Sequence, residues 1–576
     1  WGDGYIQGTS FEGYNYFANI SKRINENHQL ALTAFGAPQQ HYQRSSGLTM
    51  KEWNNVRKYM KDGVHFSRYN PTYGYDDFGN QNSANYNVYH KPQISLNHIW
   101  QIDHKSSLST TAYVSLGRGY GRTAEPGLNS SYSYTDLTYG ANYGTLSQTF
   151  RRADGTFDYG AVMWANNPEN PIYDPSSDQY EKMYAGSQLV ICENRNDHNW
   201  YGLTSTYSNK FADMFDFYAG IDVRYYQGKH NATVSDLLGG EYFIDATRAK
   251  VKGINNAAAL DPMWQYEKLT IGDIAYRNYD GFVVQEGAFA QLEYNQNNWS
   301  AFVNGSVNYN HYWKVDYFYY DAEKGKSDVL GFLGGTIKAG ANYEFNKNHN
   351  AFINVGYISR APNLDYGAFM NASTSNAVNV EAKNEQIASA EIGYGFHNQY
   401  VNVAVNGYFT EWMDKTMTKS STLSDPAQTE YFMNMTGVNA RHMGLEFEVK
   451  ARPTKWLEIS AMLSLGDWKW DSDSVVGYIY DQHGQPLTMD GEITTVGADN
   501  HGWAIINMKG INVGGSAQTT ANLGVTFKPF KGFRIGAEYT LYDRNYAYYS
   551  LSGSNLSLGK TMNLLEPWRV PVGGSM

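Results

Sequence analysis

The feature that most constrains this chain is an alternation of apolar and polar residues that stops at a few Asn, Asp, Lys or Gly and then resumes. This is the sequence signature of β-hairpins. Between Trp299 and Asn308 the apolar and polar sets fall on opposite faces, with Phe302 as the one exception. The predicted turns lie at residues 25–28, 103–106, 209–210, 295–298, 346–349, 397–399, 452–455 and 529–532. Each is flanked by strands of about ten residues, the length that crosses a bilayer at the usual barrel tilt.

The connections between consecutive hairpins are much longer than the turns. They span residues 37–90, 119–197, 228–280, 413–437 and 467–511. Short turns on one side and long loops on the other are typical of bacterial outer-membrane barrels, with periplasmic turns and extracellular loops. A soluble multi-sheet protein, such as a carbohydrate-binding propeller, rarely keeps this alternation through sixteen strands. We therefore predict an all-β protein, a transmembrane antiparallel β-barrel with about sixteen strands in this chain.

Aromatic residues support the membrane interpretation. They make up 15% of the chain, with 49 Tyr and 14 Trp. Several lie beside the short turns: Phe211, Trp299, Phe345, Phe396, Tyr400, Trp456, Phe527 and Phe533. Their common position along the strands predicts an aromatic girdle at the periplasmic interface.

Composition excludes several other classes of protein. No segment approaches the roughly 18 consecutive apolar residues of a membrane helix. The net charge is -11 and there is no basic tract, which argues against a nucleic-acid partner. The single cysteine, Cys192, is expected to be an ordinary loop thiol and forbids both an internal disulfide and a cysteine-cluster metal site.

The strand count predicts an incomplete barrel domain over residues 1–576. The strand before the first turn must descend from outside, and the strand after the eighth, residues 533–542, must ascend. Two unpaired edges in lipid are unfavourable. Three more strands at each end would give twenty-two, the size of plugged transporters, whereas one at each end would give a porin-sized eighteen. We expect the terminal strands and an N-terminal plug to be absent from this chain.

Four segments resemble the TonB-dependent receptor family, in particular its versions from Bacteroidetes-like bacteria. Residues 352–363 resemble the strand that ends in Arg-Ala-Pro at a loop start, and residues 384–394 the returning strand, with Asn384-Glu385 in place of the family's Pro-Glu. Residues 441–448 and 515–521 resemble two later strands. The segments run in the family's order.

The resemblance implies energised uptake of a bulky, scarce nutrient across the outer membrane of a Gram-negative bacterium. Its partners would be outer-membrane lipid, a small-molecule or metal-chelate cargo, and the TonB complex acting through the missing plug. A ferric siderophore is the expected cargo, and haem, cobalamin or an oligosaccharide are alternatives. A passive porin or an adhesive barrel is the alternative function.

The motifs of common enzymes are missing. The sequence has no Gly-x-Ser-x-Gly elbow, no His-Glu-x-x-His and no Gly-x-x-x-x-Gly-Lys. Acidic runs at 75–77 and 467–474 lack a calcium-loop spacing and are expected to be solvated. We predict no catalytic residue, no cofactor and no resident metal.

Several charged residues alternate with apolar neighbours along their strands. We expect them to face the lumen or the plug, because a charge on the lipid face is costly. These residues are Asp222, Arg224, Glu391, Glu446, Glu448, Arg534 and Glu538. Arg360 and Arg441, at outer strand ends, could bind an anionic chelate or form structural pairs. Tyr319 and Tyr548 could stack on a ligand or belong to an upper girdle.

Overall fold

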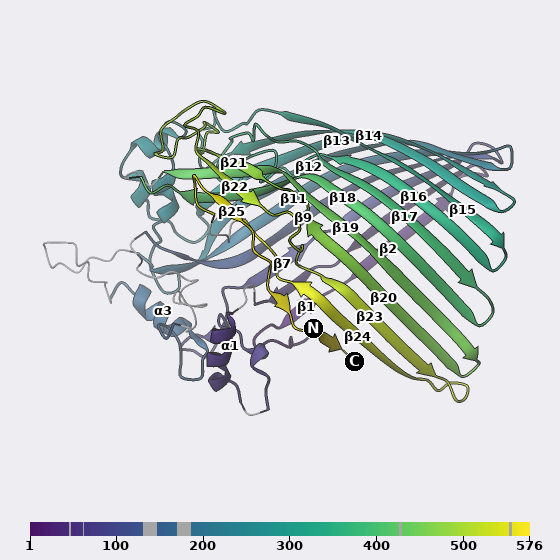
Figure 1. The fold of residues 1–576 in the computed structure, drawn as a ribbon. Coiled ribbons are helices and arrows are strands. Elements are labelled where there is room, and N and C mark those ends of the chain that lie inside the picture. The colour runs from purple at the N-terminus through teal and green to yellow at the C-terminus, as the bar shows by residue number, and fades with distance from the viewer. Residues whose placement is uncertain are drawn as a thin grey trace.

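The computed structural model describes residues 1–44, 48–61, 63–128, 130, 147–169, 186–425, 429–551 and 556–575. Within them, sixteen strands pair consecutively and antiparallel. In order they are β2 (Tyr16–Arg23), β3 (His28–Gly36), β8 (Gln93–Gln101), β9 (Ser106–Pro126), β11 (Leu189–Phe211), β12 (Phe215–Asp236), β13 (Ile274–Gln296), β14 (Trp299–Asp316), β15 (Leu330–Asn346), β16 (His349–Arg360), β17 (Glu385–His397), β18 (Val401–Thr422), β19 (Glu430–Thr454), β20 (Leu457–Trp470), β23 (Ala517–Phe527) and β24 (Ile535–Tyr546). Figure 1 shows them curving into one tilted wall, with the short turns at one end and the long loops at the other. The all-β barrel prediction is confirmed.

The wall has two edges in the part of the chain that the structure describes. On one side β2 pairs only with β3, and every residue of β2 is exposed. On the other side β24 pairs with β23 and with two short strands, β26 (Arg569–Val570) and β27 (Gly573–Ser575). The two edges do not pair with each other.

The hairpin turns lie close to their predicted positions, with one shift. The third turn was predicted at 209–210, but β11 continues to Phe211, which pairs with Phe215. The turn is at 212–214, where Ala212 and Asp213 both have a φ of 52°. The polar pair Asn209 and Lys210 stays inside the ladder, opposite Phe217 and Asp216.

Most strands are longer than the ten or so residues that cross the bilayer. β19 has 25 residues and β11 has 23, so the strands extend into the segments predicted as loops. The reason is visible at the start of β11, where residues 189–193 are all buried, because loops cover the outer half of the wall. Burial on both faces removes the alternation on which the prediction rested. Cys192, expected in a loop, lies in this buried stretch.

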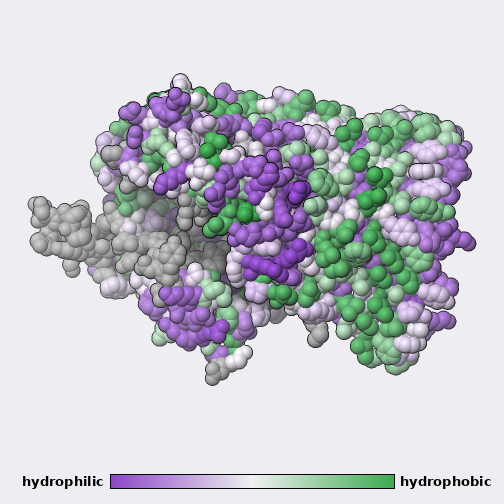
Figure 2. All heavy atoms as spheres, viewed as in Figure 1, coloured by the Kyte–Doolittle hydropathy of each residue, from purple (hydrophilic) through white to green (hydrophobic). Residues whose placement is uncertain are grey.

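The lower half of the wall has one apolar and one polar face. On β14, Trp299, Val303 and Val307 are about half exposed, whereas Ser300 lines a hollow on the inner face and Asn304 donates to Gln291 in the same lining. Phe302, the one exception to the alternation, lies on the inner face and lines the same hollow. Seven of the eight predicted girdle residues are exposed beside the turns: Phe211, Trp299, Phe345, Tyr400, Trp456, Phe527 and Phe533. Figure 2 shows apolar residues gathered over β20, β23 and β24, between polar turns and polar loops.

Loops and short elements cover the outer end. The short strands are β1 (Phe11–Gly13), β4 (Gln39–Tyr42), β5 (Gly74–Tyr75), β6 (Gln81–Asn82), β7 (Tyr86–His90), β10 (Phe157–Asp158), β21 (Val475–Tyr480), β22 (Trp503–Asn507) and β25 (Thr561–Asn563). The helices are α1 (Met50–Val56), α3 (Tyr159–Asn166) and 3-10 turns at Arg57–Tyr59, Phe66–Arg68, Ala246–Lys250, Ala257–Leu260 and Trp264–Tyr266. Met433, Val475 and Ile506 belong to a hydrophobic core in which β21 and β22 pack over β19. No helix of the described chain is long and apolar enough to cross a membrane.

Candidate functional site: the inner face of the wall

The inner face of the membrane-spanning part of the wall carries charged side chains between outward apolar neighbours. On β12, Asp222 and Arg224 alternate with Ile221 and Val223, which are 48% and 39% exposed. The Arg224 Nε atom lies 2.7 Å from an Asp222 oxygen, and Thr204 also donates to this carboxylate. The same alternation places Glu391 beside Ile392 and Glu446 beside Leu445.

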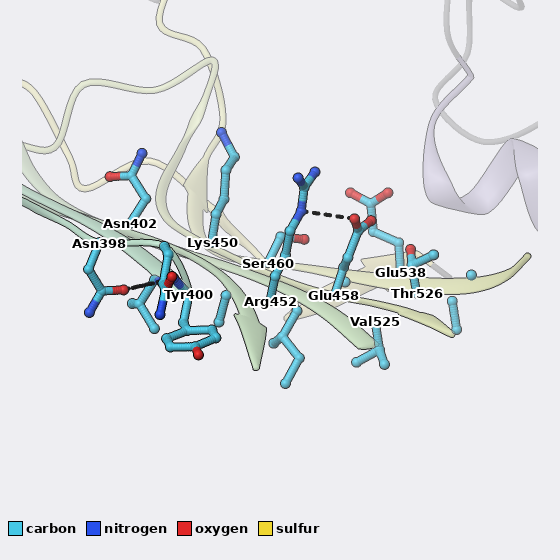
Figure 3. Close-up of a pocket in the computed structure, with 17 residues that line it drawn as sticks. Asn398, Tyr400, Asn402, Lys450, Arg452, Glu458, Ser460, Val525, Thr526 and Glu538 are labelled. Atoms are coloured by element: carbon cyan, nitrogen blue, oxygen red, sulfur yellow. Dashed lines mark hydrogen bonds and ion pairs between the residues drawn. The ribbon is translucent and has the colours of Figure 1, made fainter. Parts of the chain in front are cut away.

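An ionic ladder surrounds a hollow at the periplasmic end of this face (Figure 3). The hollow has a volume of about 670 Å³. Glu458 accepts from Arg452 at 2.9 Å and from Lys528 at 2.6 Å, and Lys450 contacts Glu448 at 2.5 Å. Figure 3 shows Lys450, Arg452 and Glu458 on one side of the strands, with Tyr400 and Val525 on the other. The arrangement separates a polar lumen from a lipid face.

The remaining predicted inner residues have weaker partners. Asn354 donates to Glu391 at 3.3 Å, and Asn522 donates to Glu538 at 2.7 Å. Arg534 lies just before β24, near Glu458. Within the described chain Glu446 forms no ion pair, so it stays available to another charged surface.

The sequence matches the family described as TonB dependent receptor-like, beta-barrel, over residues 37–561. The chain belongs to this family. It is therefore a receptor barrel of the Gram-negative outer membrane, and the family is one of transporters and receptors rather than enzymes. No curated protein matches the sequence.

Solved structures share the fold of this receptor barrel at low identity. The FrpB iron transporter from Neisseria meningitidis (F3-3 variant) is 12% identical, with a TM-score of 0.51, over 99% of this chain and 64% of its own. The ferripyoverdine receptor of Pseudomonas aeruginosa is 10% identical (TM-score 0.53; 99% and 59%). The siderophore receptor PiuA from Acinetobacter baumannii is 12% identical (TM-score 0.54; 95% and 66%). The chain thus spans 59–66% of the length of these three proteins.

Inward aromatic clusters in the outer half of the receptor wall were not predicted. One cluster joins His198, Trp200 and Tyr226, with ring centroids 5.8–6.5 Å apart. In the other, the Trp468 indole donates to the Tyr408 hydroxyl at 2.9 Å and lies beside His442. The sequence signal for these clusters is an aromatic residue at a lumen-facing position, where the alternation along the strand predicts a polar residue. Of these residues only Trp468 falls in a segment predicted as a loop, because β20 continues to Trp470.

The residues proposed to contact cargo in the receptor lie in four different environments. Arg360 forms an ion pair with Glu385, opposite it on the returning strand, and lies over the Trp412 ring at 6.0 Å. Arg441 shares the outward face of β19 with Met443 and Leu445. Tyr319 is 6% exposed and packs in a loop core, whereas Tyr548 is 75% exposed. Whether any of them binds cargo stays a prediction.

The extracellular loops of the receptor contain buried polar anchors. The Asp365 carboxylate accepts the Ala372 amide at 2.7 Å, and burial raises the pKa of Asp365 above its ordinary value. Burial also raises the pKa of the Tyr319 hydroxyl. Burial of these groups is the environment of a packed loop rather than of a solvated one.

The acidic runs have partners within the receptor itself. Asp76 accepts the Phe78 and Asn80 amides, and the Asn80 side chain lowers the pKa of its carboxyl. Asp467 pairs with Lys469 at 3.1 Å in β20, although this stretch was predicted as a loop. In the described residues no group of three or more His, Cys, Asp or Glu is arranged to hold a metal.

Proposed function

We propose that this chain is the barrel of a TonB-dependent transporter that imports a ferric siderophore across the outer membrane. The observation that carries the proposal is the family match over residues 37–561, together with a polar inner face along the wall. The solved relatives support the cargo class, since their titles name an iron transporter, a ferripyoverdine receptor and a siderophore receptor.

A plug and the TonB complex complete the proposed transporter. The chain spans less than two thirds of the length of these relatives, which leaves room for a plug domain in the whole protein. We propose that Glu446, Glu448 and Lys450 contact that plug, because they face the lumen and are among its most exposed charges. The edge of β2 and the part of the β24 edge that β26 and β27 leave open are proposed to receive the further strands of a closed barrel.

The inward aromatic clusters are the proposed cargo contacts. Tyr226 lies on the inner face of β12, and its neighbour Tyr225 lies on the outer face, 36% exposed. Aromatic rings offer a large contact area to the organic part of a metal chelate. The two tyrosines therefore form a matched pair for testing the path.

The test uses a deletion strain grown with single ferric siderophores as the iron source. We expect loss of growth on one chelate, rescue by excess iron, and rescue by the whole gene. Tyr226→Ala should raise the KM of uptake several-fold, while Tyr225→Ala should leave it unchanged. A growth defect that excess iron does not relieve would refute the cargo, and uptake that persists without the proton gradient would indicate a passive pore.

A further inference from the structure

The loop between β16 and β17, residues 361–384, contacts the inner face of the wall on one side of its root. A Cβ added at Gly281 of β13 would lie 3.6 Å from a Leu364 methyl carbon. Gly281 shares its face with Gly287, which is opposite the lumen-facing Asp222. Around this contact, one hydrophobic core joins residues of β13, β14 and the loop: Tyr279, Tyr312, Ala368, Phe369 and Ala372. The loop therefore reaches into the outer mouth of the lumen.

The same loop also contacts the wall on the other side of its root, at β19 and β21. Met370 shares a core with Phe432 of β19 and Tyr480 of β21. The Asn434 side chain of β19 donates to the Met370 sulfur at 3.3 Å. The strands from β13 to β19 pair consecutively and form one arc. Because residues 361–384 are joined to both ends of this arc, they cross it as a chord, and we call them the crossbar.

The crossbar is packed and internally bonded. Residues 367–372 are all buried. The Asn379 side chain donates to the Gly367 carbonyl at 2.8 Å and closes the crossbar on itself. The Asn376 side chain donates to the Gly325 carbonyl at 2.9 Å, in the connection between β14 and β15. A segment with this burial and bonding opens only by local unfolding.

We propose that the crossbar is a specificity element of the receptor, which keeps bulky cargo away from the lumen side of β13 to β19. The inference rests on the proposed function as an importer. A bulky solute could pass there only if the crossbar unfolded, and a solute that gains no contacts from the unfolded form does not offset that cost. The route for bulky cargo then runs along the other strands of the wall. A crossbar that only supports neighbouring loops would exclude solutes of every size equally or not at all.

The test measures how fast single cysteines in the lumen of the whole receptor react with maleimides added from outside, in a Cys192→Ala background. Ser389→Cys places one reporter on the inner face of β17, below the crossbar. Thr204→Cys places the matched reporter on the inner face of β11, where Thr204 donates to Asp222. The two reagents are N-ethylmaleimide and a maleimide on a long polyethylene glycol chain. Their comparison separates exclusion by size from general protection.

Two variants open the crossbar. In the first, a short Gly-Ser linker replaces residues 364–381. In the second, Lys314→Met removes a side chain that donates to the Ala372 and Ser375 carbonyls of the crossbar. The linker should speed the reaction of the long reagent at the Ser389→Cys reporter roughly fivefold or more, and Lys314→Met should speed it less. The N-ethylmaleimide rate should change by less than about twofold, and neither variant should change the rates at the Thr204→Cys reporter.

Two outcomes would overturn the proposal. If the long reagent reacts at the Ser389→Cys reporter equally fast with and without the crossbar, this side of the mouth is not closed by it. Equal acceleration at both reporters would mean that the loops loosen generally. A heat-shifted gel band confirms folding, and Lys314→Met is scored alone if the linker variant does not fold. Labelling needs neither cargo nor the TonB complex, so this test can fail while the growth test of import succeeds, and the reverse.

Discussion

The Nζ atom of Lys314 lies 3.2 Å from an Asp316 oxygen, and neither side chain is exposed to solvent. Lys314 also donates to the Ala372 carbonyl at 2.6 Å and to the Ser375 carbonyl at 3.0 Å. Asp316 in turn accepts the amides of Phe318 and Tyr319. This buried pair fastens the loop between β16 and β17 to the outer end of β14.

Removing the lysine should therefore release that loop. Lys314→Met leaves the Asp316 charge buried without its partner, which typically costs about 3–5 kcal/mol. We expect faster cleavage within residues 361–384 by a protease added outside, with the barrel itself intact. The double variant Lys314→Met, Asp316→Asn removes both charges and should recover much of the protection. Identical cleavage of Lys314→Met and the unaltered protein would contradict the anchoring role.

The stability of the same loop should fall as the pH rises above the open-chain pKa of an aspartate. Burial raises the pKa of Asp365 in the folded loop above the value of about 3.9 in an open chain. The folded loop thus binds the proton more tightly, and its stability falls as the pH rises through the raised pKa. Cleavage within residues 361–384, normalised to an unstructured peptide, should accelerate as the pH rises above about 4, the open-chain pKa. In Asp365→Asn that acceleration should disappear, and its persistence would assign the effect to another group.

A charge scan of β14 should separate the lipid face from the lumen face. Val303 is 47% exposed on the outward face, and its neighbour Asn304 donates inward to Gln291. Val303→Arg should cost about 2–4 kcal/mol near the midplane of the bilayer. Asn304→Arg should cost no more than about 1 kcal/mol, the worth of the hydrogen bond that it loses. Urea unfolding in lipid vesicles measures both, and equal costs would argue against the assigned faces.

The pair of Arg360 and Glu385 should behave as a structural pair. Arg360 precedes and Glu385 follows the loop that the Lys314 anchor holds, and Arg360 is 57% exposed. Arg360→Gln and Glu385→Gln should each lower stability by less than about 1 kcal/mol, as expected for an accessible pair. The KM of uptake should be the same for both variants and the unaltered receptor. An increase in KM with Arg360→Gln alone would instead assign Arg360 to the cargo.

The amino-acid sequence determined the class of fold, the number of strands and the faces of their membrane-spanning halves. It could do so because lipid and water impose opposite demands on successive residues, so that Val303 and Asn304 reveal their faces by type alone. The positions of the turns and of the girdle followed from the same local chemistry. The same chemistry predicts that Asp222, Glu391 and Glu446 face the lumen.

The tertiary structure decided what lies above the membrane. The outer halves of β11 and β19 are buried by loops on both faces, which erases the period on which a strand assignment depends. The packing of distant loops also decided that Tyr319 is a core residue and that Lys314 meets Ala372 across 58 residues. The register of β19 with its two neighbours decided that Arg441 lies between Lys469 and Glu411. Such contacts join residues far apart in the chain, and no local pattern records them.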